Sequence, residues 1–406
     1  MPETLTSRER ILRALNHEEP DRVPMDLGST HDSSIVVEGY ERLKAHFGVS
    51  SKTEIMQRMT RAAMVDEAVL QKLGIDTRAV ILGSPTRGVA VELGPRAYRD
   101  MWGVERVHPE GSYYYDQRTA PLAGSITMAD VSRYPWPDPE DPGLLSGMRE
   151  RLNWIRTHTD AAAILTLPAP FVHLTQFIRG FEGWYTDFIL GVDVLEALFD
   201  AVLEVTLRIA ERELKLLGPE VDVVRCGDDL GGQTGLQISY DHYARFIKPR
   251  HAKFFRKVKE LTPAKLMFHS CGSIVDILDD LVDIGVDIIN PVQVTARGMD
   301  PAFLKKKYGS KLVFWGGTDS QKTMPFGSVE DVHKMVATLI ETLAPGGGFV
   351  FSSCHNIQPD VSLEKVLAMF NNARNMFLPG HDDKLKFVAV TTSPARLLNC
   401  IWFYIR

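Results

Sequence analysis

The second half of the chain alternates between short apolar segments and longer amphipathic segments. From about residue 143 onward, helical patterns separate short apolar runs that are typical of buried strands. Strands that alternate with helices form parallel sheets, and eight such units are typical of a closed barrel. We therefore predict an α/β fold of the (β/α)8 TIM-barrel type. The predicted strands lie near residues 22–28, 76–83, 161–168, 221–226, 265–269, 287–292, 311–316 and 346–354.

An open, doubly wound sheet is the alternative arrangement for the same alternation. Its dinucleotide-binding versions carry a G-x-G-x-x-G motif directly after the first strand. No such motif follows residues 22–28. The closed barrel is therefore the favoured prediction.

Residues 88–125 differ in pattern from the rest of the chain. Polar and aromatic residues alternate in segments 98–107 and 111–119, and this alternation predicts β-hairpins. We interpret the region as an insertion of hairpins into the barrel, followed by the proline-rich connector 134–142. In the N-terminal part, we expect helices over residues 7–17, 35–47 and 52–73.

The predicted domain organisation is one barrel domain over residues 1–380 with an N-terminal helical extension. The atypical tail, residues 381–406, fits the alternating pattern badly. Its apolar run 397–405 is too short to cross a membrane as a helix. We therefore expect no membrane span, and we assign the tail no function.

The composition excludes several classes of function. The chain of 406 residues has 44% hydrophobic and 24% charged residues, which are values of a globular protein. A net charge of -6 without a basic block gives no reason to expect a nucleic acid partner. Four scattered cysteines are too few for a disulfide framework, and the N-terminus lacks the apolar core of a signal peptide. We expect a cytoplasmic protein whose functional cysteines bind a metal or act as nucleophiles.

Polar clusters stand at the ends of several predicted strands. In a TIM barrel, the C-terminal ends of the strands meet at one mouth, where the active site lies. Each cluster alone is a weak signal, but the barrel brings all of them together. The clusters are residues 226–229, 269–271, 316–321 and 354–356.

His269 and Cys271 are two positions apart, so their side chains point to the same side of a strand. Cys354 ends another predicted strand. One imidazole and two thiolates form a soft ligand set that suits zinc, with a fourth position left open. The alternative is a core cysteine beside a hydrogen-bonded histidine. His355 is a further candidate ligand, but its neighbour Cys354 faces the other way on a strand. We therefore expect His355 to hydrogen-bond a substrate or the loop.

Three acids complete the set of candidate catalytic residues, together with His355. We predict that Asp228 and Asp229, which glycines flank, orient His269, complete the metal shell or accept protons. Their structural alternative is a pair that caps a helix or fixes a loop. Asp319 has the same two interpretations, with the cap of the following turn as its alternative.

Five stretches of the chain carry a family resemblance. They are RERILRALNHEEPDRVP at 8–24, GDDLGGQ at 227–233, YARFIKPR at 243–250, HSCG at 269–272 and HNIQ at 355–358. Together they resemble the uroporphyrinogen decarboxylase superfamily, which includes cobalamin-dependent methyltransferases. The resemblance extends to about residue 376 and implies the (β/α)8 barrel that members of this superfamily share.

Two branches of this superfamily differ in their chemistry. Resemblance to the decarboxylases implies a metal-free barrel that binds tetrapyrrole carboxylates through arginines after the first strand. The corresponding segment here, residues 25–32, contains no arginine. The methyltransferase branch carries a His-x-Cys…Cys zinc motif, which His269, Cys271 and Cys354 match position by position.

The resemblance therefore implies a zinc-dependent methyltransferase that works with a corrinoid (cobalamin) protein. In that branch, zinc turns a bound thiol into a thiolate that attacks a corrinoid-bound methyl group, and related barrels act in O-demethylation. The small-molecule donor or acceptor is a thiol, a folate or a methoxylated compound. The alternatives are a tetrapyrrole decarboxylase and a non-catalytic barrel that binds a corrinoid or tetrapyrrole. The sequence does not specify the direction of methyl transfer, and a homodimer is possible.

Overall fold

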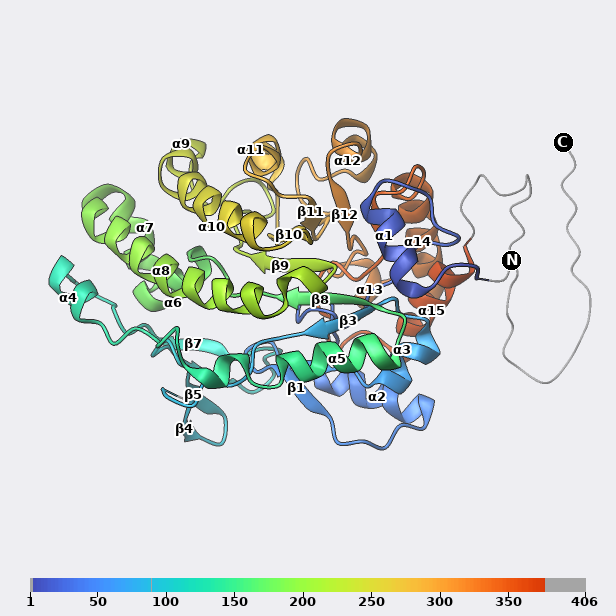
Figure 1. The fold of residues 1–406 in the computed structure, drawn as a ribbon, viewed down its shortest axis with the longest axis horizontal. Coiled ribbons are helices and arrows are strands. Elements are labelled where there is room, and N and C mark those ends of the chain that lie inside the picture. The colour runs from blue at the N-terminus through green and yellow to red at the C-terminus, as the bar shows by residue number, and fades with distance from the viewer. Residues whose placement is uncertain (1–2, 89, 377–406) are drawn as a thin grey trace, which may run out of the picture.

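A seven-stranded parallel sheet forms the centre of the computed structural model, which describes residues 3–88 and 90–376. The strands follow the order β13-β12-β11-β10-β9-β8-β3, so strands that are consecutive in this series are neighbours in space. Figure 1 shows the curled sheet with helices on its outer side. Its members are β3 (Thr77–Val80), β8 (Ala162–Thr166), β9 (Val223–Gly227), β10 (Lys265–His269), β11 (Ile288–Asn290), β12 (Val313–Trp315) and β13 (Phe349–Val350).

The barrel closes through the segment around Met25. Met25 forms a parallel bridge with Phe351, and its carbonyl oxygen accepts a hydrogen bond of 2.9 Å from the backbone N–H of Asp76. The predicted (β/α)8 barrel is therefore confirmed. The prediction of a full strand over 22–28 is wrong in length, since only this single bridge forms. Pro24 contributes to that, because proline has no N–H to donate to a strand ladder.

Alternate strand residues point into the barrel and form an inner core with helix α1 (Ser7–Leu15). Helix α1 begins with a capping box between Thr6 and Glu9. Its apolar face closes the N-terminal end of the barrel. The inner core consists of Ile11, Ala14, Leu15, Ala162, Ile164, Val223, Met267, Ile288, Val313, Trp315 and Val350.

The remaining strand residues face outward and pack against the surrounding helices in a larger core. No helix among the described residues is long and apolar enough to span a membrane. The predicted tail, 381–406, lies outside the described residues. The larger helices are α2 (Val37–Phe47), α5 (Met148–His158), α6 (Val172–Arg179), α7 (Phe181–Leu190), α8 (Val192–Leu217), α10 (Lys248–Leu261), α12 (Pro301–Tyr308), α14 (Val329–Leu343) and α15 (Leu363–Asn375).

The insertion over residues 88–125 forms a separate antiparallel sheet, so the hairpin prediction is confirmed. Figure 1 places this sheet to one side of the barrel. The loop between its last two strands approaches the end of the barrel strands, where Tyr114 contacts Asn356. The strands are β4 (Val91–Gly94), β5 (Ala97–Arg99), β6 (Glu105–Val107) and β7 (Asp116–Thr119).

The helix predicted over residues 52–73 is wrong in its first half. Two short strands pair there in antiparallel fashion, and a helix begins only after them. Ala62 is fully buried and forms a bridge with Val36, so pairing with a distant segment overrides the local helix preference. The observed elements are β1 (Glu54–Gln57), β2 (Ala62–Met64) and α3 (Glu67–Leu73).

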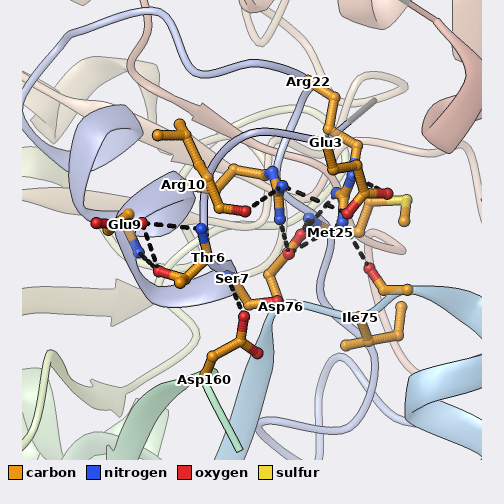
Figure 2. A network of polar contacts seen from close by, with 12 residues as sticks. Glu3, Thr6, Ser7, Glu9, Arg10, Arg22, Met25, Ile75, Asp76 and Asp160 are labelled. Carbon is orange, nitrogen blue, oxygen red and sulfur yellow. Dashed lines mark hydrogen bonds and ion pairs between the residues drawn. The ribbon is translucent and has the colours of Figure 1, made fainter. Parts of the chain in front are cut away.

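A buried carboxylate, Asp76, joins three segments at the N-terminal end of the barrel (Figure 2). It pairs with Arg10 of α1 at 2.6 Å and with Arg22 at 2.8 Å. It also accepts a hydrogen bond of 2.8 Å from the backbone N–H of Met25. These contacts hold α1 and the closing segment against β3. Residues 8–24 therefore belong to the scaffold rather than to the mouth of the barrel.

Glu213 of α8 is fully buried, and neither of its carboxylate oxygens has a hydrogen-bond partner among the described residues. Burial raises the pKa of this carboxyl well above its ordinary value. The folded protein therefore keeps a proton on Glu213 at pH values where the unfolded chain has lost it. The free energy of unfolding consequently falls as the pH rises from the ordinary pKa toward the folded pKa.

Replacing Glu213 with glutamine is expected to remove this loss. Above about pH 5, the free energy of unfolding of wild type should fall relative to that of Glu213→Gln. The difference should grow by up to about 1.4 kcal/mol for each pH unit. Denaturant unfolding at pH 5.5 and 7.5 measures it. Glu211→Gln, on the same helix, is the control and should not change the slope. Parallel pH profiles for wild type and Glu213→Gln would contradict the prediction.

Candidate metal centre

Three side chains with metal-binding atoms meet at the C-terminal ends of the strands. The ligand atoms of His269, Cys271 and His355 all lie within 4.8 Å of one another. Nε2 of His269 is 3.5 Å from Sγ of Cys271, and the rings of the two histidines are 5.9 Å apart. His269 ends β10, whereas His355 follows β13. The barrel therefore brings two of the predicted strand ends together.

Asn290, at the end of β11, orients the His269 ring. Its side-chain amide donates a hydrogen bond to the carbonyl oxygen of Trp315 at 3.2 Å, so its Oδ1 faces Nδ1 of His269 at 2.6 Å. Nδ1 must then carry the proton, which leaves the lone pair of Nε2 directed toward Cys271. Burial lowers the pKa of His269, so the ring is held in the neutral form that a metal requires.

Removing this orienting contact should weaken metal binding. Asn290→Ala is expected to lower the affinity for zinc about 10- to 100-fold, because the His269 ring loses its acceptor partner. Asn290→Asp keeps an oxygen at this place and should retain most of the affinity. Competition with a chromophoric chelator measures both. Equal affinities in wild type and Asn290→Ala would show that Asn290 does not position the ligand.

The Cys271 thiol lies beside an acid. Burial, together with the charge of Asp229, raises the pKa of Cys271 well above its ordinary value. The metal-free thiol is therefore protonated at neutral pH. A bound metal deprotonates a coordinated thiol outright. The backbone N–H of Cys271 donates to Oδ1 of Asp229 at 2.8 Å, and this bond fixes the loop after β10.

Cys354 does not belong to the group whose ligand atoms lie within 4.8 Å of one another. It is buried, and burial raises the pKa of its thiol to about 12. Its neighbour His355 takes the third place in the group, and Nδ1 of His355 is 3.3 Å from the hydroxyl of Tyr114. The structure thus places His355 closer to a ligand role than the sequence suggested. Cys354 as the third ligand stays a prediction.

Asp228 and Asp229 have different surroundings. Asp228 is fully buried and accepts hydrogen bonds from the backbone N–H groups of Phe171 at 3.2 Å and His173 at 3.0 Å. Nε2 of His251 is 3.0 Å from the same carboxylate. These contacts fix the start of α6, and they match the helix-capping alternative for Asp228. A proton-transfer role for Asp228 stays a prediction.

Asp229 faces the candidate centre. Its carboxylate is 25% exposed and lies 3.4 Å from Nε2 of His173 and 3.8 Å from Nε2 of His269. Burial by itself would raise the pKa of Asp229, but the nearby charge of His173 and their hydrogen bond hold it below its usual value. The same pair raises the pKa of His173 against the effect of burial. Asp229 is therefore an ionised acid beside the candidate centre. Its predicted role in orienting a ligand or accepting a proton stays a prediction.

Asp319 follows β12 and binds the backbone of the turn that leads into the next helix. Its carboxylate accepts hydrogen bonds from the N–H groups of Gln321 at 2.9 Å, Lys322 at 3.0 Å and Thr323 at 3.1 Å. This is the capping arrangement that the sequence allowed as its alternative. A catalytic role for Asp319 stays a prediction.

A family model described as uroporphyrinogen decarboxylase (URO-D) matches residues 113–376. This match covers more than half of the chain. The chain belongs to the uroporphyrinogen decarboxylase family. This match confirms the family resemblance that was inferred from the five sequence stretches. The fold of this family member is the barrel that closes through Met25.

A solved structure, a methyltransferase from Methanosarcina mazei, is similar in fold to this family member. The TM-score is 0.61 at 18% sequence identity, and the match covers 91% of this chain and 98% of that chain. Xylanase 10B from Thermotoga maritima matches with a TM-score of 0.32 at 11% identity, over 57% of this chain and 91% of that one. The latter score is too low to carry an argument. No curated protein matches the chain significantly by sequence.

Several residues at the mouth of this uroporphyrinogen decarboxylase family member were missed by sequence reasoning. Arg225 of β9 forms a buried ion pair with Asp32, and His31 lies 3.1 Å from the same acid. His173 and Tyr114 contact Asp229 and His355, respectively. Strand alternation is a signal that would have found Arg225, since Val223 is an inner-core position. His31, Asp32 and Tyr114 lie on loops, where no periodicity reports the direction of a side chain, and His173 lies in the first turn of α6.

Proposed function

We propose that this protein is a zinc-dependent methyltransferase that moves a methyl group between a corrinoid protein and a small molecule. The observation that carries the proposal is the group of His269, Cys271 and His355 at the mouth, with the His269 ring already oriented for a ligand on Nε2. The fold shared with a methyltransferase from Methanosarcina mazei supports it.

The donor set fits zinc. Imidazole and thiol groups are its preferred ligands. His269 and Cys271 lie together with His355, and Cys354 is the alternative third ligand of this proposal. When bound, zinc would supply a Lewis acid that favours the thiolate form of a coordinated thiol. Because both cysteines must stay reduced, we expect the protein to work in a reducing compartment such as the cytoplasm.

The chain's own residues have distinct roles in this proposal. Asn290 holds His269 in the correct tautomer, and Asp229 fixes the Cys271 backbone. The Asp229–His173 pair is partly exposed at the mouth, so it is placed to take or return a proton of the small molecule. Asp228 keeps His173 in position through its backbone N–H.

Tetrapyrrole decarboxylation is the less supported function. Decarboxylases of the family bind substrate carboxylates through arginines in the segment after the first strand, and residues 25–32 contain none. Of the two aspartates in this segment, Asp26 is fully buried and bonded to Thr77 at 2.6 Å and to Trp315 at 2.9 Å. Its carboxylate is therefore committed to the scaffold.

A transfer assay tests the proposal. The zinc-loaded protein is incubated with a methylated corrinoid protein and a panel of thiols and folates, and in reverse with methoxylated donors and the reduced corrinoid protein. Methyl transfer that Cys271→Ser abolishes is the expected result. Metal-independent decarboxylation of uroporphyrinogen would overturn it in favour of the decarboxylase. Corrinoid binding without any turnover across the panel would favour a non-catalytic barrel.

A further inference from the structure

Tyr114 reaches the candidate metal centre from the inserted hairpins. It lies in the loop between β6 and β7, is half-buried, and its hydroxyl oxygen is 3.3 Å from Nδ1 of His355. The loop is attached beside this residue to the turn between β1 and β2, because the backbone N–H of Tyr115 donates to the carbonyl oxygen of Met59 at 2.9 Å. The insertion therefore contributes a fixed side chain to the mouth of the barrel.

The Tyr114 hydroxyl belongs to a small network around Asn356. It donates a hydrogen bond of 2.5 Å to Oδ1 of Asn356. The side-chain amide of Gln358 donates to the hydroxyl at 2.6 Å and to the same Oδ1 at 2.9 Å. Asn356 is 1% exposed, and its amide nitrogen donates to the carbonyl oxygen of Thr60 at 3.4 Å. These contacts direct the oxygen of Asn356, and not its nitrogen, toward His355.

The network determines which nitrogen of His355 carries a proton. Nδ1 of His355 is 2.5 Å from Oδ1 of Asn356, and an amide oxygen can only accept a hydrogen bond. Nδ1 must therefore donate, so Nε2 keeps its lone pair in the neutral ring. His269 has the same arrangement with Asn290 as its acceptor. Both histidines are thus held in the tautomer that binds a metal through Nε2.

We propose that Tyr114 and Asn356 are positioning residues that hold His355 as the third metal ligand through Nε2. The inserted hairpins thereby become part of the metal centre. The inference rests on the proposed function, because it concerns the same zinc site. It commits the site to two imidazoles and one thiol, the group whose ligand atoms lie within 4.8 Å of one another: His269, His355 and Cys271.

The first arm of the test observes the His355 ring without metal. Nitrogen NMR of the full-length, metal-free protein with labelled histidines distinguishes a ring protonated on Nδ1 from one protonated on Nε2, and His355→Gln identifies the signals. We expect the Nδ1–H form in wild type and a loss of this preference in Asn356→Ala. A wild-type His355 ring protonated on Nε2 would overturn the inference.

The second arm measures zinc affinity by competition with a chromophoric chelator. Asn356→Ala should bind zinc about 10- to 100-fold more weakly than wild type, because His355 loses its acceptor. Asn356→Asp keeps an acceptor and should retain most of the affinity. Tyr114→Phe, which removes one hydrogen bond of the network, should lower the affinity about 3- to 10-fold.

Tyr113→Phe is the matched control for the second arm. Tyr113 is the neighbouring residue in the same loop, but its side chain is exposed and its hydroxyl contacts Asp360 at 3.2 Å, outside the network. This variant should bind zinc as wild type does. Unchanged affinity in Asn356→Ala and Tyr114→Phe, beside a wild type that binds zinc, would overturn the inference and leave the metal centre intact.

The third arm replaces zinc with cobalt(II), which reports the number of thiolate ligands. A cobalt–thiolate bond gives a charge-transfer band in the near ultraviolet. This band should have equal intensity in wild type and Cys354→Ser, and it should be absent from Cys271→Ser. A weaker band in Cys354→Ser would show a second thiolate and overturn the inference, while the methyltransferase proposal stands. A wild type that takes up neither metal would refute the metal centre and the ligand role of His355 together.

Discussion

Replacing Cys271 with serine is expected to lower the affinity for zinc by at least about 100-fold, since loss of a ligand costs more than the 10- to 100-fold typical of an orienting partner. Sγ of Cys271 is 3.5 Å from Nε2 of His269, and both belong to the group that includes His355. Serine has nearly the same shape, so the fold should remain. Zinc titration against a competing chelator, with circular dichroism as the check on folding, measures the effect.

The matched variants decide which residue is the third ligand. Cys354→Ser should lose zinc if the cysteine that follows β13 moves to the metal, and His355→Gln should lose it if the arrangement of the described structure persists. Cys226→Ser, at a buried cysteine outside the group, is the control and should keep the full affinity. Undiminished zinc binding by Cys271→Ser would contradict the proposed centre.

Asp76→Asn is expected to destabilise the protein by about 3–5 kcal/mol, which is the typical cost of breaking a buried ion pair. The fully buried carboxylate compensates both Arg10 and Arg22 and binds the Met25 backbone (Figure 2). Its loss leaves two arginines with reduced compensation at the seam where the barrel closes. Denaturant unfolding at neutral pH measures the change.

Asp160→Asn is the control for this prediction. Asp160 also contacts the N-terminal segment, through a bond of 3.1 Å from the backbone N–H of Ser7, but it is exposed. Exposed contacts of this kind contribute little, so the change should stay within about 0.5 kcal/mol. Similar losses in Asp76→Asn and Asp160→Asn would show that the seam does not depend on the buried pairs.

The periodic part of the sequence made the fold predictable. Runs such as 161–168 and 265–269 are apolar because both faces of a parallel strand are buried, and that burial is visible in the sequence. The first strand was misjudged in length although Pro24 is a local signal against a full strand. The contacts of Asp76 that close the barrel there depend on tertiary structure. Residues 52–73 were misjudged because pairing with Val36 outweighs helix preference.

The candidate site was predictable only where it lies on strands. His269 and Cys271 follow from their spacing at the end of β10, and the structure places them together. His355 lies on a loop, where side-chain direction has no period, and its closeness to His269 comes from the packing of β13. Asn290 gave no chemical signal of its own, because its role depends on the neighbour that it contacts.

The most direct test of the metal centre is the zinc content of the full-length protein. The protein is purified in reducing buffer, supplied with zinc and then freed of excess metal. Elemental analysis should find about one zinc ion per chain, as expected for a site with three protein ligands and an open position. The Cys271→Ser protein should contain almost none. A wild-type protein without zinc after this treatment would contradict the proposed metal centre, and with it the methyltransferase mechanism.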